Sequence, residues 1–524
     1  MQRSYKLLLL AGVIATLAIH AWSLMRFPAV FVDEVWLLSR AWRFNQTGQT
    51  FGMLDAGVAD RYPGYWTFLP WLGNALQGAA LRFSEYPNLL PVRALSLAMG
   101  GLLLLAVFSI ARRLGGAPAA WLAVALTAYS DPFWQSAHQA RYDCMVAAIC
   151  FSALALALLD ETWPRWWLRV LCGLAVGLAI EIHAFAAIYA VPVAALYLQR
   201  YGWRIVREPG PWQVLAGALL GLAFYVAMHI LPYPESYALL NKLYFGPSHV
   251  PPLVTLDPAV MLRSLIDTLD SILRFSLLQL PLLIGAAVWM LRYPTPERRR
   301  WLLMTGTLLL AFALLLHSHF DFYNIYVSPA FDIGVAMAVA WLWRQPLPRL
   351  SPRSRRLALA AVACLCIVNI VAQARLVTVD ANRPLAIVQG RIAATVRPGD
   401  VMMGMQNYWL ELYDHRYYTY EQLIYYRRVH PGSSVAEAMA AFKPDLFIVD
   451  GHISRFLNDG PARSDFFESL SLPRAEIKSF LDQNAVLVDT IQLDPTQDDT
   501  YGTVQIFRLR WPDRPAGRML TGLK

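Results

Sequence analysis

Acidic side chains and histidines gather in every second gap between the apolar runs of this chain. They are the pair Asp33-Glu34, Asp143, His183, and the stretch HSHFD at 317–321 with His317 and His319. Carboxylates and imidazoles exchange protons near neutral pH, and both can also bind cations. These residue types therefore predict acid–base chemistry. The H-x-H-x-D spacing leaves a divalent metal open, next to hydrogen bonding to a substrate or to lipid headgroups.

The remaining gaps are rich in arginine. They hold Arg112-Arg113, Arg165 with Arg169, Arg200 with Arg204 and Arg207, Arg292 with 298–300, and five arginines within 344–356. Lys and Arg concentrate on the cytoplasmic side of membrane proteins. The pattern thus predicts a cytoplasmic N-terminus, with the acids and histidines at the outer face. Because the basic residues sit in short gaps next to lipid headgroups, the net charge of +9 gives no reason to expect nucleic acid as a partner.

The apolar runs must position these residues. At 57% apolar residues, the chain offers runs of about 17–22 residues, each able to cross a hydrocarbon core of about 30 Å. We expect about eleven spans in the inner (cytoplasmic) membrane, with the fifth and sixth forming a re-entering pair because fusing them would place arginine clusters outside. The spans are 6–25, 92–113, 117–131, 137–159, 168–182, 184–200, 212–231, 263–291, 301–317, 326–343 and 357–373.

The predicted fold is a polytopic α-helical membrane protein with a C-terminal extracytoplasmic α/β domain. The membrane domain covers 1–373 and includes a large first outer loop, 26–91, in which two aromatic-rich stretches have helical spacing typical of helices in the membrane interface. A second outer loop, 232–262, is rich in proline and tyrosine and predicts irregular structure. Residues 374–524 are more polar and contain the strand-like runs DVMMGM, RYYTY, DLFIVD, AVLVDTIQL and TVQIFRLRW, with helical periodicity in IVQGRIAATV and SVAEAMAAF.

The first outer loop offers both an acid and a cation. Asp33 and Glu34 fall in the first turn of a predicted helix, where the helix dipole favours negative charge, so an N-cap role stands beside a catalytic one. Arg61 precedes a turn at Pro63-Gly64, flanked by Tyr62 and Tyr65. A guanidinium held there suits a lipid-linked phosphate, although an arginine that only reaches the interface remains the alternative.

The fourth span begins with HQARYD at 138–143. On a helical surface His138, Arg141 and Tyr142 would lie together, whereas Arg141 and Asp143 are too close in sequence to share a face and should serve different partners. An acid at the mouth of a span needs a partner or a cavity, which favours a functional role for Asp143. His183 follows Glu181 at the predicted outer turn, where a core role and a functional role are both open.

Taken together, the order of these stretches resembles the GT-C polytopic glycosyltransferases. The acidic pair, the basic-Pro-aromatic turn, RALSLAMGGLLLLAVFSIARRLGG and SDPFWQSAHQARYDCM are similar to the branch of protein O-mannosyltransferases and lipid A aminoarabinose transferases. The resemblance covers about residues 1–200 well. It implies transfer of a sugar from a polyprenyl monophosphate to a lipid, polysaccharide or protein acceptor outside the cytoplasm, with inversion.

The resemblance also implies roles for individual residues. Asp33 matches the catalytic base, Arg61 a basic residue near the donor phosphate, and Asp143 the acid of an Arg-x-Asp stretch that includes Arg141. His183 stands where many relatives have a lysine, and His317 and His319 replace the basic residue that usually precedes the segment FYNIYVSPA. Asp33 and Asp143 are the predicted catalytic residues, with Asp143 orienting the acceptor or Arg61. Supporting roles are predicted for Glu34, Arg141, Tyr62 and Tyr65.

Two other classes of function stand against this one. A secondary transporter or lipid-linked glycan flippase would also carry intramembrane charges, but it predicts inverted repeats and charges near mid-span, which the sequence does not offer. A non-catalytic partner in glycan assembly would keep the architecture without the reaction. Neither the sugar nor the acceptor can be predicted from the sequence.

Overall fold

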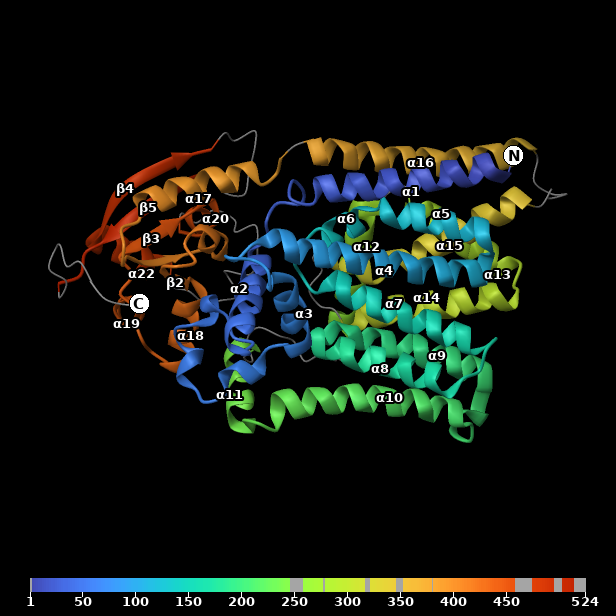
Figure 1. Cartoon of the computed structure of the whole chain (residues 1–524), viewed down its shortest axis with the longest axis horizontal. Helices are drawn as coiled ribbons and strands as arrows, with labels where there is room; N and C mark the ends of the chain where they lie inside the picture. The colour runs from blue at the N-terminus through green and yellow to red at the C-terminus, as the bar shows by residue number, and fades with distance from the viewer. Residues whose placement is uncertain are drawn as a thin grey trace. The chain divides into compact units, whose positions relative to one another are not determined.

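The computed structural model describes residues 2–245, 258–276, 279–315, 321–344, 352–378, 380–457, 474–493 and 502–512. These residues are mostly helical, with one five-stranded sheet in the C-terminal segment (Figure 1). Contacts along the chain divide it into two units. The first comprises residues 1–28, 93–228 and 251–379, and the second comprises 29–92, 229–250 and 380–524. The C-terminal segment thus shares its unit with most of the first outer loop.

The first unit is a bundle of helices (Figure 1). Among the described residues, α4 (Leu89–Gly115), α7 (Asp143–Asp160), the run Pro209–Ile230 and Leu359–Leu376 are long and apolar enough to cross a membrane. The chain is therefore a multi-pass membrane protein, while the count of eleven spans stays a prediction. The run Pro209–Ile230 begins with α10 (Pro209–Tyr225), and Leu359–Leu376 lies within α16 (Pro352–Thr378). The other helices described in the unit are α1 (Gln2–Ser23), α5 (Ala117–Ala128), α6 (Asp131–Ala137), α8 (Trp166–Ile182), α9 (Ala190–Tyr201), α12 (Pro258–Ser276), α13 (Gln279–Arg292), α14 (Pro296–Leu315) and α15 (Ser328–Arg344).

Two predicted span boundaries can be compared with these helices. A helix break falls between the fifth and sixth predicted spans, because α8 ends at Ile182 and His183 is extended at φ −157° and ψ 126°. That the two parts form a re-entering pair of spans stays a prediction. The span predicted at 263–291 is covered by α12 and α13, and residues 277–278 between them lie outside the described residues, so the single span stays a prediction.

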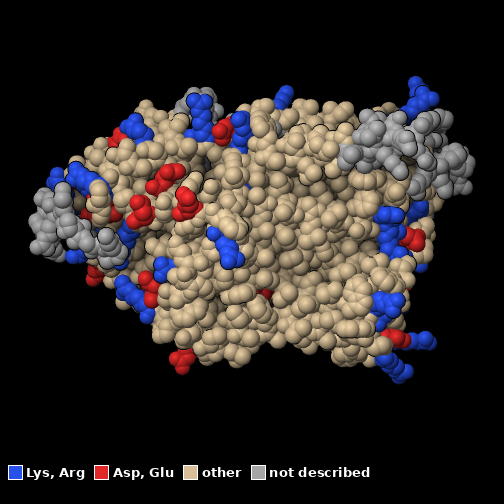
Figure 2. Space-filling view, viewed as in Figure 1, with Lys and Arg blue, Asp and Glu red and all other residues tan. Residues whose placement is uncertain are grey.

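Arginines from several predicted inner gaps gather at one end of the bundle. Asp160 and Glu161, at the end of α7, pair with Arg113 (3.5 Å), Arg169 (2.8 Å), Arg200 (2.7 Å) and Arg300 (3.0 Å). Figure 2 shows a broad surface with few charged side chains over the helices, and Lys and Arg side chains at one end of them. These gaps therefore lie on one side, as the prediction requires; that this side is cytoplasmic remains an expectation.

Helices α8 and α10 approach each other through glycines. Gly173 and Gly177 on α8 face Gly217 and Gly221 on α10, and a Cβ atom at Gly173 would lie 1.8 Å from the carbonyl oxygen of Val214. Pairs of small residues four positions apart let transmembrane helices pack backbone to backbone. No larger residue fits this contact without moving a helix.

The C-terminal part of the second unit is an α/β fold. Its sheet has the order β2-β1-β3-β5-β4, with β1 (Val401–Gly404) parallel to β2 (Arg416–Thr419) and β3 (Leu446–Val449), and β5 (Thr503–Leu509) antiparallel to β3 and β4 (Ala485–Gln492). Helices α17 (Arg383–Thr395), α18 (Glu421–Val429), α19 (Val435–Phe442), α20 (Gly451–Leu457) and α22 (Arg474–Asn484) complete it. The five predicted strands and both predicted helices are confirmed. The fully buried β1 and β3 explain their continuous apolar sequences.

Loop segments complete the second unit. The two stretches with helical spacing form α2 (Val32–Thr47) and α3 (Trp71–Leu81), as predicted, joined by the 3₁₀ turns η1 (Met53–Asp55), η2 (Ala59–Arg61) and η3 (Tyr65–Phe68). The irregular structure expected for 232–262 is wrong over Pro234–Phe245, which form α11 and bury Leu240. Proline in the first turn starts this helix instead of preventing it. Gly64 has a φ of +70°, as the predicted tight turn requires.

Candidate active site

The neighbouring acids at the start of α2 occupy different environments. Glu34 is fully buried, and its Oε1 accepts a hydrogen bond from the backbone N–H of Phe31 at 3.0 Å. This carboxylate satisfies a helix N-terminus and completes its first turn. Asp33 lies in the same turn but is only half-buried. The N-cap position belongs to Phe31, so the pair separates into a supporting residue, Glu34, and a more accessible carboxylate, Asp33.

The C-terminal domain fixes the peptide that precedes these acids. Asn382 Oδ1 accepts a hydrogen bond from the backbone N–H of Val30 at 2.7 Å, and Asn407 Nδ2 donates to the carbonyl oxygen of Val30 at 3.2 Å. Gln389 Nε2 in turn donates to the backbone oxygen of Asn407 at 2.7 Å. Both backbone polar groups of Val30 are bound to side chains of one domain, which holds the first turn of α2 in place.

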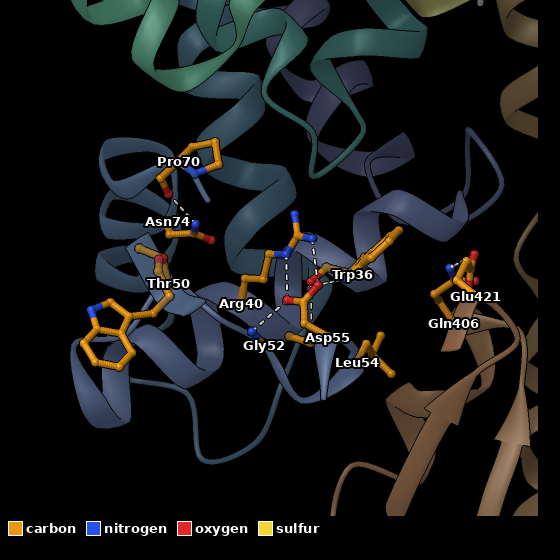
Figure 3. A network of polar contacts seen from close by, with 12 residues as sticks. Trp36, Arg40, Thr50, Gly52, Leu54, Asp55, Pro70, Asn74, Gln406 and Glu421 are labelled. Carbon is orange, nitrogen blue, oxygen red and sulfur yellow. Dashed lines mark hydrogen bonds and ion pairs between the residues drawn. The ribbon is translucent and has the colours of Figure 1, made fainter. Parts of the chain in front are cut away.

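A second acid, Asp55, binds the loop that follows α2 to this helix. Its buried carboxylate accepts hydrogen bonds from Arg40 Nε (2.9 Å) and Nη2 (2.8 Å), from Trp36 Nε1 and from the backbone N–H of Gly52 (2.9 Å), as Figure 3 shows. Trp36 and Arg40 are four residues apart on α2, so a single carboxylate ties η1 to one face of this helix. The sequence analysis missed Asp55, because its distance along the chain from Arg40 carries no periodic signal.

The predicted donor-phosphate cation, Arg61, lies at the end of η2 and is exposed. Its charge acts on Tyr418 of β2: burial raises the pKa of Tyr418, while the charges of Arg416 and Arg61 lower it. Tyr62 is half-buried. Tyr65 packs edge-on against Phe51 with ring centroids 4.2 Å apart, and burial raises its pKa. The aromatic neighbours therefore shape this turn while the guanidinium of Arg61 remains accessible.

Within the first unit, Asp143 is the centre of a buried polar group. Arg141 Nε donates to its Oδ2 at 2.8 Å, and the Tyr326 hydroxyl donates to its Oδ1 at 2.9 Å. The prediction that Arg141 and Asp143 serve different partners is wrong. It assumed that His138, Arg141 and Tyr142 lie on a helix, whereas residues 138–142 are non-helical and α7 begins at Asp143. The bends at 138–142 let the Arg141 side chain reach its near neighbour Asp143.

Aromatic side chains surround this ion pair. The Arg141 guanidinium lies 4.0 Å from the ring centroid of Phe322, in η7 (Asp321–Tyr326). His183, half-buried, has its ring 6.4 Å from that of Tyr323, and its Nδ1 accepts a hydrogen bond from the backbone N–H of Phe185 at 3.3 Å. The structure thus brings together Asp143, Arg141, His183 and the FYNIY stretch, which lie in three separate predicted outer gaps.

His317 and His319 lie outside the described residues, so their predicted role stays a prediction. Among the residues that the structure describes, no group of three His, Cys, Asp or Glu side chains could hold a metal ion. Binding of a divalent metal by the HSHFD stretch therefore stays a prediction.

A buried histidine pair holds the end of α1 and was not predicted. His20 Nδ1 lies 2.8 Å from His138 Nε2, and His138 Nδ1 lies 3.0 Å from the carbonyl oxygen of Phe27. Arg93, fully buried, donates to the carbonyl oxygen of Leu24 at 2.9 Å. These contacts fix the backbone where the chain leaves α1 for the first loop. Each of these polar residues lies in or next to an apolar run, and its position in the sequence does not indicate which distant polar residue it contacts.

Comparisons with known proteins agree on one fold. Residues 70–229 match the family model described as dolichyl-phosphate-mannose-protein mannosyltransferase, and no curated protein sequence matches the chain. The structure of ArnT from Cupriavidus metallidurans bound to undecaprenyl phosphate is similar with a TM-score of 0.61 at 14% identity, covering 97% of this chain and 98% of that one. This chain has the GT-C fold.

The GT-C match extends to a second enzyme. The archaeal oligosaccharyltransferase AglB from Archaeoglobus fulgidus, in complex with an inhibitory peptide and a dolichol-phosphate, matches with a TM-score of 0.50 at 14% identity, over 98% of this chain and 75% of that one. The predicted resemblance to GT-C glycosyltransferases in the branch of ArnT and the protein mannosyltransferases is confirmed. The family model covers the region from α3 to α10, which includes Asp143, Arg141 and His183.

Proposed function

We propose that this protein is an integral-membrane glycosyltransferase that moves a sugar from a polyprenyl monophosphate to an acceptor on the outer side of the cytoplasmic membrane. The observation that supports this best is the match along nearly the whole chain with ArnT, whose structure was solved with undecaprenyl phosphate. In this proposal the N-terminus is cytoplasmic, and both the first outer loop and the C-terminal domain are extracytoplasmic.

Asp33 is the proposed general base. It is a half-buried carboxylate, a group that can accept a proton, and its buried neighbour Glu34 completes the helix turn. The acceptor hydroxyl or amine gives its proton to Asp33 as its oxygen or nitrogen bonds to the anomeric carbon. The bond from that carbon to the phosphate oxygen breaks, and polyprenyl phosphate leaves. One displacement inverts the anomeric configuration.

The leaving phosphate needs positive charge and hydrogen bonds more than a proton. Arg61 is the proposed cation of the second unit, and His183, His317 and His319 are its proposed counterparts in the first. Asp143, with both oxygens bound by Arg141 and Tyr326, is better placed to position a guanidinium than to accept a proton. We therefore assign Asp143 and Arg141 to substrate positioning.

The experiment is release of undecaprenyl phosphate from undecaprenyl-phosphate sugars by the purified protein, with a membrane extract as the source of acceptor. Asp33→Asn should lower this release by at least about 100-fold, the range expected for loss of a general base. Asp414→Asn, the same substitution at a side chain that is 70% exposed in the C-terminal domain, should leave it unchanged. Normal turnover by Asp33→Asn would refute the assignment. A transporter, a flippase or a non-catalytic partner would release no undecaprenyl phosphate at all.

A further inference from the structure

The carboxyl ends of three parallel strands form a polar edge in the C-terminal domain. β1 lies between β2 and β3, and the chain leaves β1 toward β2 but returns from β2 to β3, so the connections diverge at β1. In open α/β sheets, ligands bind beyond the carboxyl ends of strands at such a point. The residues that follow these strands here are Gln406, Glu421 and Asp450.

The same edge holds the start of α2. Asn407, beside Gln406, donates to the carbonyl oxygen of Val30, and α2 packs against η8 (Gln406–Glu411). Asp33 follows Val30 by three residues, and its charge acts on the carboxyl group of Glu421: burial raises the pKa of Glu421, its hydrogen bonds lower it, and Asp33 raises it. The first turn of α2 and Glu421 therefore lie at the same edge of the sheet.

The two acids of this edge are bound differently. Asp450 has both oxygens engaged, accepting from the Tyr408 hydroxyl at 3.0 Å and from the backbone N–H of Ile453 at 3.1 Å. Glu421 Oε1 accepts from Gln406 Nε2 at 2.6 Å (Figure 3), and hydrogen bonds from the Thr419 side chain and the Glu421 backbone also lower the pKa of the Glu421 carboxyl group. Its Oε2 has no hydrogen-bond partner among the described residues, although the side chain is only 5% exposed.

A buried carboxyl oxygen without a donor is costly, by about 1–3 kcal/mol in general and more if charged. A purely structural acid would be bound at both oxygens, as Asp450 is. Glu421 thus has the features of a group that awaits a hydrogen-bond donor from outside the chain.

We infer that Glu421 is an acceptor-binding residue of the Asp33 site, with its Oε2 receiving the hydrogen bond of a hydroxyl or ammonium group on the acceptor substrate. Hydroxyl and ammonium groups share the N–H or O–H donor that this oxygen lacks, and either could be next to the nucleophile that Asp33 deprotonates. The role rests on the proposed function. It gives the C-terminal domain a direct part in acceptor choice, in addition to holding the first turn of α2.

The test separates acceptor use from donor binding and from folding. Glu421→Gln keeps the shape of the side chain but replaces its carboxylate oxygens by one amide oxygen and one NH₂ group. We expect it to lower sugar transfer to acceptors in a membrane extract by at least about tenfold at limiting extract, with less loss at saturating extract. The Kd for undecaprenyl phosphate should stay unchanged, and the thermal unfolding midpoint should not fall. Glu437→Gln, at an exposed helix cap of the same domain, is the matched control and should transfer normally.

Three results would overturn the inference: unchanged transfer, a loss that extract cannot relieve, or a transfer loss accompanied by a lower unfolding midpoint, which would make Glu421 structural. If the unsubstituted protein binds undecaprenyl phosphate but releases none from any sugar donor, the proposed function fails instead. Because that outcome is measured on the unsubstituted protein alone, failure of the proposed function can be distinguished from failure of the role inferred for Glu421.

Discussion

Replacing Asp55 by alanine should strongly destabilise the second unit. The substitution leaves Arg40, whose side chain is 11% exposed, without its partner, and it removes the acceptor of Trp36 Nε1 and of the Gly52 N–H. Removing one member of a buried ion pair costs about 3–5 kcal/mol. Each amide or indole N–H left buried would add about 1–3 kcal/mol if water cannot reach it. Because these costs are not additive, we expect a total loss of about 4 kcal/mol in the free energy of unfolding.

The assay is urea unfolding of the purified protein in detergent micelles, followed by tryptophan fluorescence. A double-mutant cycle with Arg40→Leu isolates the pair. If the Arg40–Asp55 ion pair stabilises the loop, the double variant Arg40→Leu/Asp55→Ala should lose clearly less free energy of unfolding than the sum of the two single variants, because it contains neither charge of the pair. The reasoning would be refuted if Asp55→Ala cost no more than Asp414→Ala, which alters an exposed carboxylate.

Three further results are expected. Tyr326→Phe, which removes one hydrogen bond to Asp143, should lower undecaprenyl phosphate release about tenfold, or about 1.4 kcal/mol in the barrier, and a normal rate would argue against a positioning role for this carboxylate. Glu34→Ala should lower the free energy of unfolding by about 1 kcal/mol through the lost helix-terminal hydrogen bond, measured by the same urea titration; an equal loss from Glu85→Ala, at an exposed site in the same loop, would contradict this. Burial raises the pKa of Glu421 in the folded state, so ionising this carboxyl group lowers the stability of the unsubstituted protein as pH rises through that pKa. The free energy of unfolding of Glu421→Gln, relative to that of the unsubstituted protein, should therefore increase with pH. A difference that does not change with pH would contradict the raised pKa.

Local sequence patterns predicted the elements well. The strands around Met402, Phe447 and Ile506 were visible because short runs of β-branched, aromatic and other apolar residues end at polar turns. The break at His183 followed from counting arginines on each side of the membrane, a constraint that acts along the whole chain. Patterns of this kind depend on neighbours in sequence or on the bilayer, and both can be read without coordinates.

Contacts between distant residues could not be predicted in the same way. The Arg141–Asp143 pair was missed because it depends on where α7 begins, and a shift of a few residues in a helix boundary changes which side chains share a face. Asp55 and Glu421 were missed because their partners come from other segments. An acid directly after a predicted strand was the available signal for Glu421, and it becomes informative only once the strand order is known.

The glycine contact between α8 and α10 bears on how this protein can be handled outside its native bilayer. The α10 run is only 17% buried inside the chain, so its attachment depends greatly on the contact at Gly173, Gly177, Gly217 and Gly221. Such a contact is held by close van der Waals fit and weak Cα–H···O bonds, not by exclusion of water. Its strength therefore does not derive from the surrounding solvent, and the helix pair should persist on transfer from lipid to mild detergent.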